Sequence, residues 1–300
     1  MLEGGQANVP PGAGQRFLDF IEVGTSDFDT LVQKASNDDL GLSIEPLRAY
    51  LDRLPSPSNC EKLCAAISDR DGEATVFHVR PERVVELGLS SWVRGCNTLG
   101  APHPAVVKLL KSQGLDPAAV LEQETVPVYR LATVFRRLGL SGAFRLKVDT
   151  EGHDGVILED FFAHCETFQR PHHLRFESNW LGDKDRFHRL VVRLIQCGYD
   201  IVSISTQDGA SESVFDLNLK RVVNGSRYSP PIAGYYLGGY PKGYNPLAPP
   251  HEATLAGAQA WCASEGFCGV THQDGRFEVR GGWELLKEPN RSAVTTWIRM

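Results

Sequence analysis

Segments with a strand pattern and segments with a helical pattern alternate along most of the chain. The run "FLDFIEV" (17–23) is almost continuously apolar, as expected of a strand that is covered on both faces. Residues 27–35 then change to helical spacing, and the same succession is repeated downstream. This alternation predicts an α/β fold with a mostly parallel sheet and helices on both of its faces. Further strands are expected at 40–46, 61–68, 143–149, 173–179, 200–205 and 212–222, and further helices at 47–54, 129–140, 155–164 and 185–199.

The last two expected strands are joined only by the turn "TQDGA", with no helix between them. Two strands joined in this way run antiparallel, because a parallel pair needs a long crossover connection. The sequence therefore predicts a parallel sheet whose last strand is reversed and lies at the edge.

Composition and charge exclude some classes of partner. The 300 residues carry a net charge of −6, which argues against nucleic acid as a partner. No apolar run approaches the ~18 residues that a membrane span needs. Seven scattered cysteines fit a reducing compartment better than a disulfide framework, so we expect a cytoplasmic protein. The cysteines and histidines show no metal-ligand spacing, so no metal site is expected.

Acidic residues follow several expected strands at the points where those strands end. Because the carboxyl ends of parallel strands meet at one edge of a sheet, a ligand site is expected at that edge. A row of carboxylates there repels phosphate and suits hydroxyls, an amino group or a cation. The strand ends in question are Glu22-Val23-Gly24, Glu45-Pro46, Ser68-Asp69, Asp149-Thr150-Glu151 and Glu177-Ser178-Asn179.

The loop after the first strand lacks the features of a dinucleotide site. A pyrophosphate cradle needs a Gly-x-Gly-x-x-Gly turn, whereas this loop has one glycine, Gly24, together with acidic residues. Glu45, at the end of the second strand, stands where an acidic residue usually binds ribose hydroxyls. A nucleoside without phosphates that carries a cationic centre fits this pattern, and S-adenosylmethionine is such a molecule.

Four segments together resemble the FkbM-type methyltransferases, which use S-adenosylmethionine. The resemblance covers roughly residues 16–205, and its most specific motif is "KVDTEGHD" (147–154). It implies a class I methyltransferase fold, which is Rossmann-like, with a seven-stranded sheet and an antiparallel last strand. The four segments, in chain order, are "FIEVGTSDFDTL", "LSIEPL", "CAAISDRDG" and "LKVDTEGHDGVIL".

The resemblance also implies roles for individual residues. Glu22 and Gly24 would line the methionine and ribose end of the cofactor, and Glu45 would bind the ribose hydroxyls. Ser68 and Asp69 would lie near the adenine, and Asp149 and Glu151 would stand beside the methyl group and the acceptor. The chain departs from the family at Phe28, where a second glycine is usual.

Several other residues have both a functional and a structural interpretation. His153 is either a general base or an exposed loop histidine, and Asp69 is either a ligand contact or a cap. Asn97 and His103 lie in the irregular-looking segment 89–106, which either contacts the substrate or forms an ordered surface loop. Glu177 would face the acceptor, whereas Lys147 is expected to pair with a neighbouring carboxylate.

The sequence predicts four regions. Residues 1–15 form a flexible N-terminus, 16–223 a methyltransferase-like domain, 224–250 a Gly-, Pro- and Tyr-rich linker, and 251–300 a small C-terminal unit with a helix and a hairpin. Within that unit, spacing leaves open whether Cys262 and Cys268 form a disulfide.

The expected function is transfer of a methyl group from S-adenosylmethionine to a hydroxyl or amine of a small-molecule or carbohydrate-like acceptor. The alternative is a non-catalytic interaction protein on the same fold, in which the C-terminal unit binds the partner. Phe28 favours the alternative, and the intact motif 147–154 favours the enzyme.

Overall fold

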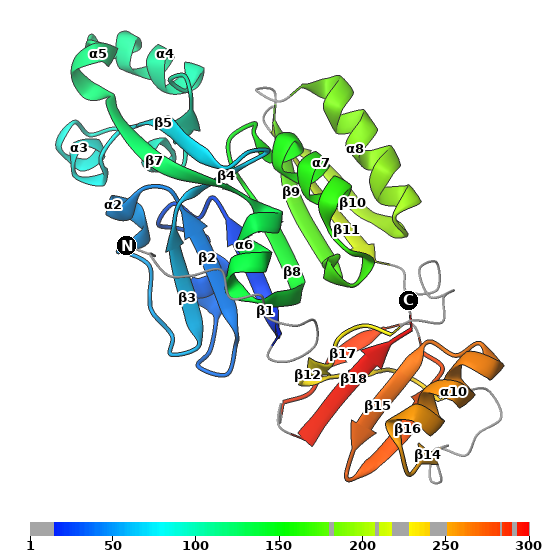
Figure 1. The fold of residues 1–300 in the computed structure, drawn as a ribbon. Coiled ribbons are helices and arrows are strands. Elements are labelled where there is room, and N and C mark those ends of the chain that lie inside the picture. Colours follow the sequence, from blue (N-terminus) through cyan, green and yellow to red (C-terminus); the bar gives the residue numbers. More distant parts are fainter. Residues whose placement is uncertain are drawn as a thin grey trace.

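The alternating strands of the first two thirds of the chain form one seven-stranded sheet (Figure 1). Its strand order is β3-β2-β1-β8-β9-β11-β10. Neighbouring strands from β3 to β9 are parallel, and β11 is antiparallel to both β9 and β10. The predicted mostly parallel sheet with a reversed last strand is therefore confirmed, and it is compatible with a Rossmann-like fold. The expected edge position of the reversed strand is wrong, because β11 lies between β9 and β10 and β10 forms the edge. The strands are β1 (Arg16–Val23), β2 (Gly41–Glu45), β3 (Cys60–Cys64), β8 (Leu140–Val148), β9 (His173–Asn179), β10 (Tyr199–Gln207) and β11 (Ala210–Leu217).

The computed structural model describes most of the 300-residue chain. The described residues are 15–179, 183–207, 210–217, 228–240, 251–282, 284–289 and 293–299. The predicted N-terminal region 1–15 lies outside them except for Gln15.

Three helices, α6 (Leu131–Leu138), α7 (Asp154–His164) and α8 (Lys184–Gln196), lie side by side over one face of the sheet (Figure 1). The apolar side chains of α7 reach the main core, where Leu158 and Phe161 are fully buried. The helix after β1 is shorter than predicted: α1 (Leu31–Lys34) begins only where the Thr30 side chain caps it. The helix after β2, α2 (Arg48–Leu51), is also short.

A second sheet is formed by the chain between β3 and α6, with strand order β4-β7-β5-β6. The segment 89–106, predicted as irregular, contains only short regular elements, but it packs around a core of its own that includes Val93, Val106 and Leu110. The predicted strand 61–68 is wrong as a single element, since β3 ends at Cys64 and the next strand pairs with β7. The elements are β4 (Ala66–Ser68), β5 (Gly72–His78), α3 (Pro81–Glu86), η1 (Ser91–Arg94), β6 (Thr98–Leu99), α4 (Pro104–Ser112), α5 (Pro117–Val120) and β7 (Glu122–Arg130). A short 3-10 helix, η2 (Thr167–Gln169), precedes β9.

The C-terminal unit contains the expected helix and hairpin, together with strands that were not expected. The hairpin strands are the centre of a five-stranded sheet, β12-β18-β15-β16-β14, and α10 packs on them. Residues 228–240 were predicted as linker but contain β12 and β13, which pair with β18 and β17; the rest of 224–250 lies outside the described residues. The elements are β12 (Ile232–Ala233), β13 (Tyr235–Leu237), β14 (His251–Glu252), α10 (Leu255–Glu265), β15 (Gly269–Gln273), β16 (Arg276–Arg280), β17 (Leu285–Lys287) and β18 (Val294–Ile298).

One apolar core runs from the seven-stranded sheet into the C-terminal unit. Tyr235 of β13 is completely buried, and its ring contacts Phe17 and Phe144 of the large sheet. Its hydroxyl donates a hydrogen bond to Asp19 on β1. Removal of the chain after residue 223 would therefore expose part of this core rather than leave a closed domain.

All seven cysteines are free thiols, so the open question of a bond between Cys262 and Cys268 is answered in the negative here. Both thiols are buried and donate to backbone carbonyls, Cys262 to Phe267 and Cys268 to Arg280. Among the helices of the described residues, none is long and apolar enough to span a bilayer.

Replacement of Tyr235 by Phe tests the attachment of the C-terminal unit. The change keeps the ring and removes the donor to a buried carboxylate, so the free energy of unfolding should fall by about 1.5–3 kcal/mol. Urea unfolding of the full chain measures this difference. The matched control is Tyr236→Phe on the same strand, which should change stability by less than about 0.5 kcal/mol. Equal stability of the two variants would remove the Asp19 contact from the forces that hold the unit.

Candidate functional site

A cavity of about 300 Å³ lies where the carboxyl ends of β1, β2, β8 and β9 meet the second sheet. The large sheet supplies Gly24, Glu45, Asp149, Glu151 and Glu177 to its wall, and all five were predicted as site residues. The second sheet supplies the opposite side, including Trp92, Cys96, Asn97 and Leu99. The volume falls at the lower end of the ~300–1,000 Å³ usual for small-molecule sites.

Gly24 ends β1 in the left-handed region, with φ +78°. A Cβ atom on this residue would lie 1.9 Å from the carbonyl oxygen of Asp149, which no side chain tolerates. The sequence suggested that a ligand approaches this glycine. The structure shows that the backbone after β8 makes the close approach, while Gly24 still forms part of the cavity wall.

Glu22 lies under the cavity and forms no part of its wall. Its side chain has no solvent exposure, and its oxygens accept the Leu31 amide at 2.7 Å and pair with Lys147 Nζ at 3.0 Å. Burial raises the pKa of Glu22, and Lys147 opposes that rise. The pairing expected for Lys147 is therefore confirmed, and Glu22 fixes the sheet beneath the site instead of reaching a ligand directly.

Glu45 is almost completely buried, yet it forms part of the cavity wall. Its carboxylate accepts the backbone amides of Ser26 at 2.8 Å and Leu47 at 3.2 Å. Burial raises the pKa of Glu45 to about 7, although these amides oppose the rise. The amide of Thr25 also contributes a hydrogen bond to this carboxylate. A carboxylate has about four acceptor sites, so about one remains for a ligand hydroxyl.

Three carboxylates converge at one end of the cavity. The oxygens of Asp149, Glu151 and Glu177 lie within 4.8 Å of one another. Asp149 is 41% exposed through the cavity mouth, and Lys147 lies 3.5 Å from its carboxylate. Loss of solvent around the carboxylate raises the pKa of Asp149, and the positive charge of Lys147 opposes this rise. This end of the cavity therefore attracts positive charge and can accept a proton.

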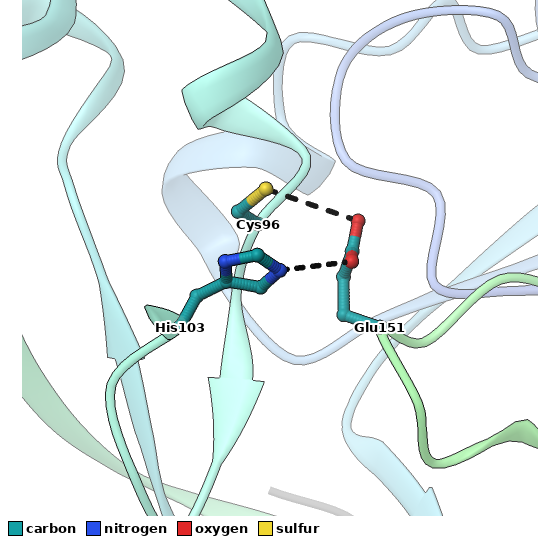
Figure 2. Close-up of side chains that lie close together, drawn as sticks. All are labelled: Cys96, His103 and Glu151. Atoms are coloured by element: carbon teal, nitrogen blue, oxygen red, sulfur yellow. Dashed lines mark hydrogen bonds and ion pairs between the residues drawn. The ribbon is translucent and has the colours of Figure 1, made fainter. Parts of the chain in front are cut away.

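Cys96, His103 and Glu151 form a second group that shares Glu151 with the carboxylates (Figure 2). Glu151 lies in the loop between β8 and α7 with φ +53°, and His103 precedes α4. His103 Nε2 is 3.3 Å from Glu151 Oε2, and the Cys96 thiol is 4.0 Å from Glu151 Oε1. Burial, followed by the charge of Glu151, raises the pKa of Cys96. The sequence predicted Glu151 and His103 as site residues but missed Cys96, because nothing in its local pattern sets it apart.

Ser68, Asp69 and His153 lie together but away from the cavity wall. His153 Nε2 is 2.9 Å from the Ser68 hydroxyl, which donates to Asp69 at 3.1 Å. Burial lowers the pKa of His153. The wall at this point is instead formed by Ala65, Ala66 and Ile67, just before the predicted pair.

The loop after β1 is clamped to the second sheet. The buried carboxylate of Asp27 pairs with Arg94 and with Arg53, each at 3.0 Å. The Arg94 guanidinium lies over the ring of Phe28, 5.3 Å from its centroid, and a Cβ atom on Gly95 would lie 3.2 Å from that ring. Phe28 is 38% exposed and forms part of the cavity wall. A glycine at position 28 would remove this wall contact.

A hydrogen-bond acceptor in the wall has no partner in the part of the chain that the structure describes. Asn97 donates from Nδ2 to the Arg94 carbonyl at 3.0 Å, while its buried Oδ1 has no hydrogen-bond partner among the described residues. A buried acceptor without a partner is costly, and a ligand N–H or O–H would satisfy it.

No protein-family model matches the chain, and a search of the curated proteins finds no match.

Replacement of Lys147 by Met tests the ion pair beneath the cavity. It leaves the buried Glu22 without a charged partner, so the free energy of unfolding should fall by about 3–5 kcal/mol. The double variant Glu22→Gln/Lys147→Met removes both charges and should recover most of that loss in urea unfolding.

Lys34→Met serves as the control, because it breaks an exposed pair with Asp29 and should cost about 1 kcal/mol or less. A double variant as unstable as Lys147→Met alone would show that packing of the lysine chain, and not charge pairing, dominates.

Proposed function

We propose that this chain is an S-adenosylmethionine-dependent methyltransferase that acts on a hydroxyl or an amine of a small-molecule or carbohydrate-like acceptor. The observation that carries the proposal is the position of Glu45. It ends the second strand of a parallel sheet, is buried, and forms part of the wall of a cavity at the carboxyl ends of the strands. A carboxylate in that position suits the two hydroxyls of a ribose.

The chemistry of the wall supports a nucleoside without phosphates. Glu45, Asp149, Glu151 and Glu177 make the site anionic, which disfavours pyrophosphate. Apolar surface for a base is present at Ile44, Ala66 and Leu99. The strand order and the antiparallel β11 also support the proposal, because the family resemblance implies such a sheet.

Two groups in the wall fit the polar parts of the cofactor. Glu45 retains acceptor capacity after binding Ser26 and Leu47, and Asn97 Oδ1 is a buried acceptor that a ligand amine or hydroxyl would satisfy. When bound, S-adenosylmethionine would supply an electrophilic methyl group and a positive charge. The carboxylates at the end of the cavity would hold that charge and the acceptor together.

The chain must also remove a proton from the acceptor. Asp149 is the best placed carboxylate, since it is partly exposed in the cavity and lies next to Glu151 and Glu177. Its raised pKa makes it a stronger base than an ordinary aspartate once it is ionised. Lys147, 3.5 Å away, favours its ionised form.

Phe28 favours the alternative of a non-catalytic interaction protein. Its ring occupies part of the wall of a small cavity, and this narrows the space for a cofactor and an acceptor together. Under that alternative the cavity would bind neither S-adenosylmethionine nor its demethylated product.

Calorimetry with the demethylated product tests cofactor binding directly. The full chain should bind it, and Glu45→Gln should weaken binding by about 1–3 kcal/mol, because ribose hydroxyls would lose a charged partner. Asp38→Asn changes an exposed carboxylate and should bind as the unmodified chain does. A folded Glu45→Gln protein with unchanged affinity would remove Glu45 from the site, and absence of binding by the unmodified chain would favour the interaction protein.

Asp149→Asn tests the proton acceptor, after a screen with labelled cofactor has identified a methyl acceptor. Turnover should fall by roughly two orders of magnitude, the usual scale for a positioned acid–base group. Cofactor affinity should change less, because the interaction is made mainly in the transition state. Asp69→Asn, an exposed strand-end acid away from the cavity, should retain full turnover. Full activity of Asp149→Asn would move the search to Glu151 and Glu177.

A further inference from the structure

We propose that Cys96, His103 and Glu151 bind a zinc ion at the edge of the cavity. The inference goes beyond the proposed function and does not depend on it. A thiol, an imidazole and a carboxylate converge from three separate segments of the chain, and their ligand atoms all lie within 4.8 Å of one another (Figure 2). Sulfur, nitrogen and oxygen are the three ligand types that zinc accepts in proteins.

The distances are close to those of a tetrahedral site. Zinc bonds of about 2.0–2.3 Å imply separations of roughly 3.3–3.6 Å between ligand atoms. His103 Nε2 lies 3.3 Å from Glu151 Oε2, which matches that range, and the Cys96 sulfur lies 4.0 Å from the other carboxylate oxygen, Oε1. Rotation of the Cys96 and Glu151 side chains would bring the sulfur and one carboxylate oxygen to the ion together.

The position of the group in the fold favours a site with an open coordination position. His103 is buried, whereas Cys96 and Glu151 both form part of the cavity wall. Three protein ligands would therefore hold the ion, and its fourth position would face the cavity, as in catalytic zinc sites. Asp149 and Glu177 lie beside Glu151, and their negative charge strengthens the attraction for a divalent cation.

The hydrogen bond on the other imidazole nitrogen opposes metal binding. His103 Nδ1 accepts the Ala105 amide at 3.2 Å, so in the metal-free protein the proton is on Nε2, which faces Glu151. Coordination through Nε2 moves that proton to Nδ1 and breaks the cap of α4. The loss of a cap costs about 2- to 30-fold in affinity. The affinity of zinc for a site with three protein ligands exceeds this loss by many orders of magnitude.

The thiol selects the metal. Magnesium and calcium prefer oxygen ligands only, and these are offered by Asp149, Glu151 and Glu177. Cys96 adds a soft ligand that favours zinc and cobalt(II). The neighbouring carboxylates therefore make magnesium the competing ion to be tested.

The full chain is treated with a chelator, dialysed and titrated with zinc against a chromogenic chelator. It should bind about one zinc ion per chain at submicromolar free zinc. Loss of a residue that only hydrogen-bonds to a metal ligand weakens metal binding by about 10- to 100-fold. Cys96→Ala and His103→Ala remove a ligand itself, so each should weaken zinc binding by more than this. Cys64→Ala, which removes a half-buried thiol at the end of β3, should retain full affinity.

Cobalt(II) gives a readout that is independent of affinity. The unmodified chain should show the visible bands of tetrahedral cobalt and a thiolate charge-transfer band, and Cys96→Ala should lose the latter. Circular dichroism and thermal unfolding without metal show whether each variant is folded, and Glu151→Gln replaces any variant that is not. Zinc uptake well below one equivalent would overturn the proposal. So would equal affinity in Cys96→Ala and Cys64→Ala, or magnesium binding that matches zinc and is insensitive to Cys96.

Discussion

Lys147 joins the two central strands to the loop that follows the first of them. Its ammonium group contacts the Glu22 carboxylate, the Asp149 carboxylate and the backbone carbonyl of Asp29. Buried ion pairs add little net stability compared with apolar residues of the same volume, but they penalise any arrangement in which one charge is left alone. The pair therefore selects the register of β1 against β8, and through Asp29 it sets the position of the loop. Gly24 and Asp149, which follow these two strands and form part of the cavity wall, depend on that register.

The second sheet turns an open sheet edge into an enclosed cavity. The clamp from Asp27 to Arg94 and the hydrogen bond from the Ser26 hydroxyl to the Arg94 carbonyl hold this insertion on the loop after β1. Displacement of the insertion would remove Arg94 from the buried Asp27 carboxylate and leave Arg53 as its partner, at a cost in ion-pairing. These contacts hold the second sheet's side of the cavity, which includes Asn97 and Cys96, against the loop after β1.

The sequence predicts the large sheet well because its signals are local. β9 begins and ends where its apolar pattern does, and the short "TQDGA" connection was enough to predict the reversed strand. The second sheet was missed because its pairings are long-range: β5 pairs with β7 across some fifty residues, and β4 with β7. The break at Ala65 is invisible in the pattern, since the apolar character of 63–67 continues through it.

In the candidate site, too, residues marked by a local sequence signal could be predicted and residues brought together by long-range contacts could not. Glu45, Asp149, Glu151 and Glu177 could be predicted because they share a rule, the acidic end of a parallel strand. Asp69 obeys the same pattern and lies elsewhere, since the strand before it belongs to another sheet. Cys96 and His103 could be brought together with Glu151 only by the fold, which places residues 96, 103 and 151 within a few ångströms.

The two proposals place different demands on Glu151. As a zinc ligand it would be neutralised by the ion and held in the left-handed backbone conformation that it already adopts. It could then no longer help to hold a sulfonium or take the proton of an acceptor. Those tasks would fall to Asp149, which Lys147 orients from below, and to Glu177 on β9. Without the ion, three neighbouring carboxylates repel one another, and a cationic ligand relieves that repulsion. A bound zinc ion would therefore weaken the attraction for a cationic cofactor while leaving Asp149 as the base, so the two ligands are expected to compete for the charge of Glu151.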